Sequence, residues 1–398
     1  MKPKPDLRLP DHLTKIIEAD YPRFSAAELK RRRGLIADAM TQAGVDHLVI
    51  HAAFFRGGAV HWLTDWLTTY EAVVVFTPGR DDTLFIQFFN HLPQAHEIMP
   101  QMDIRWGGES TIAVAIEEVK QRGAKPGRVG FVGFLPPHYV RALASAFEEP
   151  KDLNRAYIQA RMIKSAEEID WARIAARLSD MSVEAMHREI QPGMDERDVG
   201  ALIQAAYLPW RGTDIIHFVS ATPMDEPKVF VPRQHPSTRK LQQGDVISCE
   251  ITASFWEHWG QTLRTMTLGE PANALFQRLH SVGEKAFDAM FDAIRPGARS
   301  TDLLVGARLI EQEGLSYYDD LVHGFGGGYL PPVIGSPLRE NGALPDFELK
   351  PGMMLVLQPN VIDVKQNAGI QVGELVVVTD RGAETLHTIP RTLTEIAC

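Results

Sequence analysis

The stretch Gly244-Asp-Val-Ile-Ser-Cys-Glu250 returns later in the chain as Gly352-Met-Met-Leu-Val-Leu-Gln358. Each copy begins with a glycine, continues as an apolar run and ends on a polar side chain. Glycine accepts the positive φ that a tight turn needs, and a short apolar run beside a turn signal is typical of a buried strand. The two copies therefore predict two equivalent strands, each ending on a polar residue.

A second repeat precedes each of these strands. Ile190-Gln-Pro-Gly193 leads into a helix that ends near Tyr207, and Ile294-Arg-Pro-Gly297 leads into a helix that ends near Glu313. A helix, turn and strand unit that is used twice indicates a domain with pseudo-two-fold symmetry, and such a domain usually places its site between the halves.

The chain before these repeats has a different pattern. Ser165-Ala-Glu-Glu168 has the spacing of a capping box, which predicts the start of a long helix. Upstream of it, helices alternate with strands, which indicates an α/β domain. The expected strands are 47–50, 72–76, 83–87 and 128–133, and the expected helices are 26–44 and 112–122. Four prolines among the first 22 residues indicate a loosely structured lead-in over residues 1–24. We expect an α/β domain over 25–155 and a second domain over 156–398.

Composition limits the classes of partner. Of the 398 residues 44% are hydrophobic and 23% are charged, so a core can form without support from a metal or a disulfide. The net charge of −10 argues against nucleic acid and against anionic membranes as partners, because both require concentrated Lys and Arg. A small-molecule substrate is the expected partner.

Two further features bear on the cellular location. Two cysteines, Cys249 and Cys398, do not make a disulfide framework. The first residues contain no apolar segment of the kind found in signal peptides. We expect a cytoplasmic protein.

Six short motifs are spread over the chain. They are Trp62-Leu-Thr-Asp65, Met162-Ile-Lys-Ser-Ala-Glu-Glu-Ile169, Lys240-Leu-Gln-Gln-Gly-Asp245, His323-Gly-Phe-Gly326, Leu349-Lys-Pro-Gly-Met353 and Val376-Val-Val-Thr379. Together they resemble the creatinase, prolidase and Xaa-Pro aminopeptidase family over roughly residues 27–390. The resemblance implies a creatinase-like α/β N-terminal domain and a C-terminal pita-bread domain with pseudo-two-fold symmetry, α/β (α+β) in class. It also implies a homodimer, with the contact coming from the region Trp62–Glu71.

The metallopeptidases of this family bind two divalent ions through Asp, Asp, His, Glu and Glu. The corresponding positions in this chain hold Glu250, Gln261, Gly327, Gln358 and Gly373. Glycine cannot ligate a metal ion, and a neutral amide is a weak ligand for a divalent ion. The resemblance therefore implies no cofactor here and a character closest to the metal-independent members, creatinase and ectoine hydrolase.

Three residues are the expected catalytic group: Glu250, His323 and Glu374. Glu250 ends an apolar strand, where burial raises the pKa of a carboxyl group toward that of a general acid or base, unless the carboxylate simply pairs with Arg264. Glu374 is expected to face Glu250, so that the two carboxyl groups have different pKa values. The resemblance places His323 against substrate. Strand alternation points Cys249 away from Glu250.

A second group is expected to bind substrate. The side chains of glutamine suit an amide, carboxylate or urea-like ligand. The aromatic ring of a tyrosine suits a planar or cationic ligand. Core packing is the alternative explanation for the histidines and the tyrosine of this group. The residues are Gln261, Gln358, His235, His217, Arg264 and Tyr329.

Three functions follow as hypotheses. The first is a metal-independent hydrolase or lyase that cleaves a C–N or neighbouring bond of a small polar nitrogen compound. The second is an Xaa-Pro dipeptidase or aminopeptidase with atypical metal ligands. The third is a catalytically inactive binding module.

Overall fold

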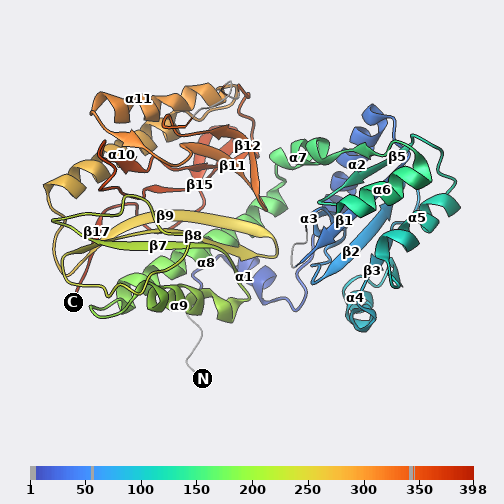
Figure 1. The fold of residues 1–398 in the computed structure, drawn as a ribbon, viewed down its shortest axis with the longest axis horizontal. Coiled ribbons are helices and arrows are strands. Elements are labelled where there is room, and N and C mark those ends of the chain that lie inside the picture. The colour runs from blue at the N-terminus through green and yellow to red at the C-terminus, as the bar shows by residue number, and fades with distance from the viewer. Residues whose placement is uncertain (1–5, 55–57, 340–343, 345) are drawn as a thin grey trace. The chain divides into compact units, whose positions relative to one another are not determined.

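The computed structural model describes residues 6–54, 58–339, 344 and 346–398, which form two compact units (Figure 1). One unit is Asp20–Arg161, and the other combines Met162–Cys398 with the residues up to Ala19. The division falls near residue 161, not at the expected 155/156, because helix α7 (Asn154–Met162) packs with the first unit. Tyr157 of α7 makes an edge contact with Trp62 at 5.6 Å between ring centroids.

The expectation of a loosely structured lead-in is wrong for the described residues 6–24, and its first five residues lie outside the described part of the chain. Residues Asp11–Glu18 form helix α1, which buries Leu13 and Ile17. The Arg177 guanidinium of the C-terminal unit donates to the Leu7 carbonyl at 2.6 Å. The prolines of this region therefore flank an ordered segment, with Pro10 at the N-cap of α1.

The unit Asp20–Arg161 is the predicted α/β domain. Its six-stranded sheet has the order β4-β3-β2-β1-β5-β6, with a buried apolar cluster on each face. β1 pairs in parallel with β5 and antiparallel with β2. The strands are β1 (His47–Ala53), β2 (Glu71–Phe76), β3 (Thr83–Ile86), β4 (Asp103–Trp106), β5 (Val129–Val132) and β6 (Lys151–Asp152). The helices besides α7 are α2 (Ala26–Ala43), α3 (Gly58–Thr64), η1 (Phe89–His91), α4 (Leu92–Ile98), α5 (Thr111–Gln121) and α6 (Pro137–Phe147).

The C-terminal unit contains the two predicted repeats. The first copy is α8 (Ala166–Glu189), which begins at the predicted capping box of Ser165, then α9 (Glu196–Tyr207), β7 (Thr213–Pro223) and β8 (Asp245–Phe255). The second copy is α10 (Ala274–Ala293), α11 (Val305–Gln312), β11 (Val322–Phe325) and β13 (Met354–Leu357). The other elements are β9 (His258–Leu268), β10 (Ser316–Tyr317), β12 (Tyr329–Ile334), β14 (Val361–Ile362), β15 (Gly373–Thr379), β16 (Gly382–Thr385), β17 (Thr394–Ile396), η2 (Leu208–Trp210) and η3 (Ser300–Leu304).

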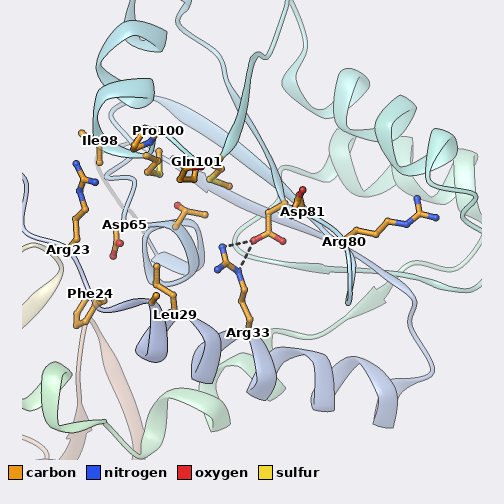
Figure 2. A pocket seen from close by; sticks show the side chains of 15 residues that line it. Arg23, Phe24, Leu29, Arg33, Asp65, Arg80, Asp81, Ile98, Pro100 and Gln101 are labelled. Atoms are coloured by element: carbon orange, nitrogen blue, oxygen red, sulfur yellow. Dashed lines mark hydrogen bonds and ion pairs between the residues drawn. The ribbon is translucent and has the colours of Figure 1, made fainter.

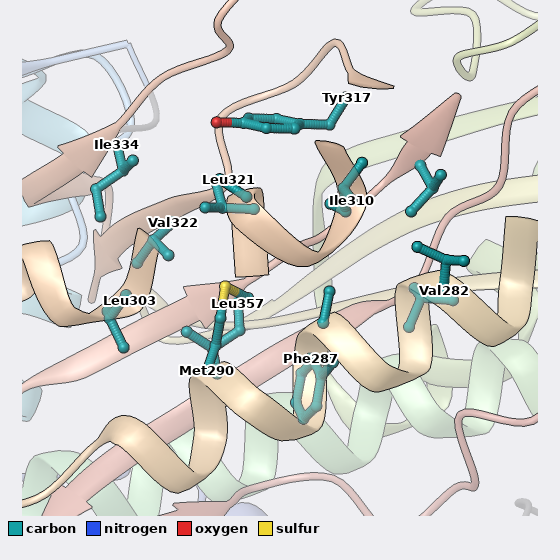
Figure 3. Packing of buried hydrophobic residues seen from close by; sticks show 14 of the residues in the cluster. Val282, Phe287, Met290, Leu303, Ile310, Tyr317, Leu321, Val322, Ile334 and Leu357 are labelled. Carbon is teal, nitrogen blue, oxygen red and sulfur yellow. The ribbon is translucent and has the colours of Figure 1, made fainter. Parts of the chain in front are cut away.

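Most of its strands form one large sheet of the order β12-β11-β13-β15-β9-β8-β7, with β16 paired to β15 and β17 paired to β9. β10 and β14 form a separate two-stranded sheet. In Figure 1, α8 and α9 lie beside β7–β9, and α10 and α11 lie at the opposite side of the unit. The apolar side chains of α10 and α11 pack against one face of the strands of the second copy, as Figure 3 shows for Phe287, Met290 and Leu357. This packing leaves the other face of those strands for a site.

Within the described residues, no helix is both long and apolar enough to cross a membrane.

Candidate active site on the inner face of the large sheet

Strand register decides which polar residues share a face. Glu250 of β8 lies opposite Leu263 of β9, which lies opposite Gly373 of β15. Directly opposed residues point to the same side of a sheet, and neighbours along a strand point to opposite sides. Following the register across β15, β13 and β11 brings His323 to the same face. We call this side the inner face, and it carries Glu250, Gln261, Leu263, Leu375, Val356 and His323.

The sheet curls so that distant strands meet across the inner face. Trp259 of β9 and Phe325 of β11 are in edge contact, with 5.5 Å between their ring centroids. In strand order, β13 and β15 lie between them. Leu263 and Phe325 also belong to one buried apolar cluster. The curl therefore brings β9 and β11 together across the inner face. The prediction that Glu250 ends its strand is wrong, because β8 continues to Phe255 and Glu250 lies in its middle.

Glu250 and Gln261 form a hydrogen-bonded pair at the centre of this face. The Gln261 side-chain amide donates to the Glu250 carboxyl group at 2.5 Å. Burial raises the pKa of Glu250 to about 8, the charge of Asp319 adds to the rise, and the Gln261 hydrogen bond opposes it. A carboxyl group with this pKa exchanges a proton near neutral pH, which is what a general acid or base requires.

His323 presents a buried imidazole ring to the inner face. The side chain is 0% exposed and stacks on Tyr329 with 3.9 Å between ring centroids. Burial lowers the pKa of His323 to about 4, against the weaker effects of the Gly324 carbonyl and of Gln358. Nδ1 lies 3.2 Å from the Gly324 carbonyl, and Nε2 has no hydrogen-bond partner among the described residues. Donation from Nδ1 leaves Nε2 as a buried acceptor.

Unpartnered amide oxygens surround these two groups. Gln358 donates to the Asp320 carbonyl at 2.7 Å, and Gln371 donates to the Asp319 carboxylate at 3.3 Å. Each amide nitrogen faces an acceptor, so its orientation is fixed. In the described part of the chain the side-chain oxygens of Gln371 and Gln261 have no donor, and the side-chain oxygen of Gln358 lies toward His323. A ligand with several N–H groups would satisfy them.

Asp319 was missed by the sequence reasoning. It accepts hydrogen bonds from Asn360 at 2.9 Å and from Gln371, and its charge acts on Glu250. The charges of Asp320, Glu250 and Asp319 all raise the pKa of Tyr329, after burial. The signal in the sequence was the acidic pair directly before the strand that carries His323.

The prediction that Glu374 faces Glu250 is wrong. Gly373 lies on the inner face, so its neighbour Glu374 points to the other side of the sheet, where it lies opposite Thr262. There it accepts from Arg264 at 2.6 Å, from Arg391 at 3.0 Å and from Thr385 at 2.6 Å. Burial opposes ionisation, but Arg264 and the other donors outweigh it and lower the pKa of Glu374. The carboxylate is held as a buried structural ion pair.

Arg264 is likewise not placed to bind substrate. Its guanidinium is buried and donates to the carbonyls of Pro390, Leu263, Gly373 and Ile389 besides Glu374. Neither does it pair with Glu250, which was the alternative explanation for that carboxyl group.

The two remaining histidines lie away from the inner face. His217 lies opposite Ile251, a neighbour of Glu250, so it points to the other side of the sheet, where its Nε2 lies 3.0 Å from the Tyr207 hydroxyl. His235 is exposed in the segment between β7 and β8. That segment is held by Glu196, which pairs with Arg233 at 2.6 Å and accepts from the Ser237 backbone at 2.6 Å.

The residues at the expected metal-ligand positions do not fit a pair of divalent ions. The inner face offers one carboxyl group with a raised pKa and two amides at these positions, and the Gln261 amide turns its nitrogen, not its oxygen, toward Glu250. A Cβ on Gly373 would lie 2.4 Å from the Leu357 carbonyl oxygen, so a glutamate cannot be accommodated there without moving the backbone. Within the described ranges no three His, Cys, Asp or Glu side chains form a metal-binding group.

Comparisons with known proteins agree with this fold. A family model described as metallopeptidase family M24 matches residues 170–380. The probable dipeptidase PepE of Mycobacterium tuberculosis is 28% identical over 235 residues, which are 58% of this chain and 60% of that protein. The Xaa-Pro dipeptidase of Pyrococcus furiosus is 24% identical over 252 residues, covering 63% of this chain and 70% of that protein. The creatinase of a Bacillus species is 23% identical over 399 residues, covering 93% and 92%.

Solved structures are similar over nearly the whole chain. The dipeptidase PepE from Mycobacterium ulcerans has a TM-score of 0.75 at 23% identity, covering 94% of this chain and 100% of that one. The X-Pro aminopeptidase from Thermotoga maritima has a TM-score of 0.77 at 19% identity, covering 92% and 99%. The predicted pita-bread fold and the family resemblance are confirmed, and the chain belongs to metallopeptidase family M24.

Proposed function

We propose that the chain hydrolyses the amide bond of a small peptide-like substrate and that Glu250 transfers the proton, without a pair of metal ions. The first hypothesis from the sequence favoured a small nitrogen metabolite. The relatives named dipeptidase and Xaa-Pro dipeptidase give more support to the second hypothesis, a peptide substrate. The residues at the ligand positions support the absence of a dinuclear centre, although the family name implies a metal.

The observation that carries this proposal is the pair Glu250–Gln261. Its two members occupy adjacent strands at positions where the family resemblance expects two metal-binding aspartates, and they hydrogen-bond to each other. The amide stabilises the ionised carboxylate, while burial and Asp319 stabilise the protonated form. Both forms are therefore populated near pH 8, as a residue that alternates between base and acid requires.

The chemistry assigned to these residues balances in two steps. The Glu250 carboxylate accepts a proton from water while the water oxygen bonds to the amide carbon. The protonated carboxyl group then donates to the leaving nitrogen as the C–N bond breaks. The Gln261 oxygen accepts an N–H group of the substrate, and the neighbouring pair of His323 and Gln358 offers further polar atoms that orient it. Tyr329, 51% exposed, forms an aromatic wall beside His323.

A second candidate substrate is a creatine-like nitrogen compound. The similarity to creatinase spans more of this chain than the similarity to either dipeptidase named above. The acceptor oxygens on the inner face and the acidic Asp319 also suit a cationic, donor-rich ligand.

One assay separates these candidates. Purified protein is tested against a panel of Xaa-Pro dipeptides and a panel of guanidino and other small nitrogen compounds, each with and without chelator. Turnover of dipeptides in chelator supports the proposal, and turnover of the second panel alone supports the creatine-like candidate. Dipeptide turnover that requires added metal contradicts the proposed chemistry. If both panels fail while ligands raise the melting temperature, the protein is the inactive binding module of the third hypothesis.

We also propose a homodimer with a cytoplasmic location. The dimer rests on the family resemblance of the region Trp62–Glu71, and the location on the sequence features given above.

A further inference from the structure

The unit Asp20–Arg161 contains a pocket of its own, which the proposed reaction does not use. Its volume is about 630 Å³, within the range of ligand-binding cavities. Figure 2 shows it between the helix that carries Leu29 and Arg33 and the segment that carries Ile98 and Gln101. All of its lining residues belong to this one unit.

An incompletely satisfied carboxyl group lines the pocket. Asp65 follows directly after α3, is 3% exposed and adopts a φ of 64°. One of its oxygens, Oδ1, has no hydrogen-bond partner among the described residues. Burying an acceptor without a donor is costly, because it has lost its hydrogen bonds to water. A ligand that brings a donor into the pocket would remove this cost.

Cationic side chains line the same pocket. Arg23 lies at the same end as Asp65 in Figure 2, and its positive charge acts on the Asp65 carboxyl group. Among the described residues its guanidinium makes one long hydrogen bond, a donation to the Glu97 carbonyl at 3.3 Å. Arg33, by contrast, is engaged with Asp82 at 2.8 Å. Arg80 also belongs to the lining, but in Figure 2 it points away from Asp65 at the other end of the pocket. Arg23 is therefore the cation best placed to bind a carboxylate beside Asp65.

Part of the remaining lining is apolar, beside the polar side chains of Thr64, Asp81 and Gln101. Phe24, Leu29, Ile98, Met99 and Met102 contribute to the wall. Thioether side chains adapt to different apolar groups. A ligand of this pocket thus needs a donor and an anionic group close together, and an apolar portion beyond them.

We infer that this pocket binds a free α-amino acid with an aliphatic or other apolar side chain, its ammonium group on Asp65 and its carboxylate on Arg23. An α-amino acid carries its ammonium group and its carboxylate on the same carbon. It can therefore reach Asp65 and Arg23 together, because these two side chains lie at the same end of the pocket. A simple amine satisfies only Asp65, and a simple carboxylate satisfies only Arg23. The inference does not depend on the proposed hydrolysis.

Calorimetric titration of the full chain with L-leucine tests this inference. We expect one saturable site per chain. 3-Methylbutylamine and 4-methylpentanoate each lack one charged group and should bind about tenfold more weakly or worse, the cost of a lost charged hydrogen bond. Asp65→Asn keeps the shape of the side chain and tolerates the positive φ, and it should weaken leucine binding by a similar factor. Arg23→Gln should do the same.

Two matched variants locate the site. Asp81→Asn removes an exposed carboxylate of the same pocket and should change the leucine affinity less than about twofold, as expected for a screened surface charge. Glu250→Gln alters the inner face of the large sheet and should leave the affinity unchanged. The inference is overturned if leucine, methionine and phenylalanine give no saturable heat, or if binding survives Asp65→Asn. It is also overturned if binding is lost in Glu250→Gln, because the amino acid then occupies the inner face.

Discussion

The amide nitrogen of Gln261 lies 2.5 Å from a carboxyl oxygen of Glu250, on adjacent strands of the large sheet. Two carboxylates at these positions would repel each other without a cation between them. An amide and a carboxyl group instead attract each other, so the pair is stable by itself. What remains is a carboxyl group with a raised pKa, able to exchange protons at neutral pH.

Glu250→Gln tests whether this carboxyl group does the chemistry. The variant keeps the size of the side chain and removes its proton exchange, so kcat should fall by about 10²- to 10⁴-fold. KM should change little, because the acceptor oxygens of Gln261 and Gln358 remain. Steady-state kinetics on the substrate identified by the panels measures both constants. Glu226→Gln, an exposed position, is the matched control. A near-normal kcat in Glu250→Gln would remove Glu250 from the mechanism.

Glu374→Gln separates the structural carboxylate from the catalytic one. Removing one partner of a buried ion pair leaves Arg264 uncompensated, at a cost of about 3–5 kcal/mol in the free energy of unfolding. Denaturant titration of Glu374→Gln should show this loss of stability, whereas the same titration of Glu250→Gln should not.

The lowered pKa of Glu374 makes the effect of its substitution depend on pH. In the wild type, the ion pair of Glu374 with Arg264 stabilises the fold above the pKa that Glu374 has in the unfolded chain. This stabilisation is lost as the pH falls through the lower pKa of Glu374 in the folded protein. The free energies of unfolding of wild type and variant should therefore converge in acid. Equal stability of the two proteins at pH 7 would contradict the structural assignment.

The difference between these two glutamates explains where sequence reasoning succeeded and failed. The repeated Pro-Gly and strand motifs gave the two halves of the domain, because local turn and strand signals are contained in the sequence. Neighbours on a strand face opposite ways, which separates Glu374 from Gly373 just as it separates Cys249 from Glu250. This alternation places Glu374 on the outer side.

Other features depend on tertiary structure and leave little trace in the sequence. Asp319 reaches Glu250 electrostatically only because the sheet curls. Asp65 looks like an ordinary residue of a loop until its burial and its unpartnered oxygen are seen. The segment 11–18 forms a helix because it packs Leu13 and Ile17 into the C-terminal unit, which proline content alone did not reveal.

Metal content provides a test that is independent of any substrate. The protein purified in buffer without chelator should contain far less than one Mn, Co, Fe or Zn per chain, because the ligand positions offer only one carboxyl group. Elemental analysis measures this directly, with a dinuclear M24 dipeptidase prepared in parallel as the positive control. Gly373→Glu should not create a site, because the new Cβ meets the Leu357 carbonyl. Two equivalents of metal in the wild-type protein would contradict the prediction.

The oligomeric state is expected to be a homodimer. Light scattering coupled to size-exclusion chromatography should give a mass close to twice the 44.4 kDa of one chain. Substituting exposed aromatic side chains near the region Trp62–Glu71, for example Tyr70→Lys, should shift the mass toward one chain. Phe134→Lys, an exposed aromatic outside that region, is the control and should leave the mass unchanged. A wild-type protein that elutes as an active monomer contradicts the prediction.

Asp65→Asn should stabilise the ligand-free protein, and more at pH 8 than at pH 5. Burial raises the pKa of Asp65 to about 6 from 3.8, against the lowering effects of Arg32, the Phe24 backbone, Arg23 and Arg33. A folded-state pKa above the unfolded one means that the folded protein binds the proton more tightly. Its stability therefore falls as pH rises from about 4 to about 6 and stays lower above that range. At about 1.4 kcal/mol per pKa unit, the ionised carboxyl group costs up to about 3 kcal/mol of folding stability, a cost that asparagine avoids.

Thermal unfolding of wild type and Asp65→Asn between pH 5 and pH 8 measures the difference in stability between the two proteins. Saturating L-leucine should narrow this gap by satisfying the wild-type carboxylate. A gap that is constant with pH would show that Asp65 does not ionise in this range.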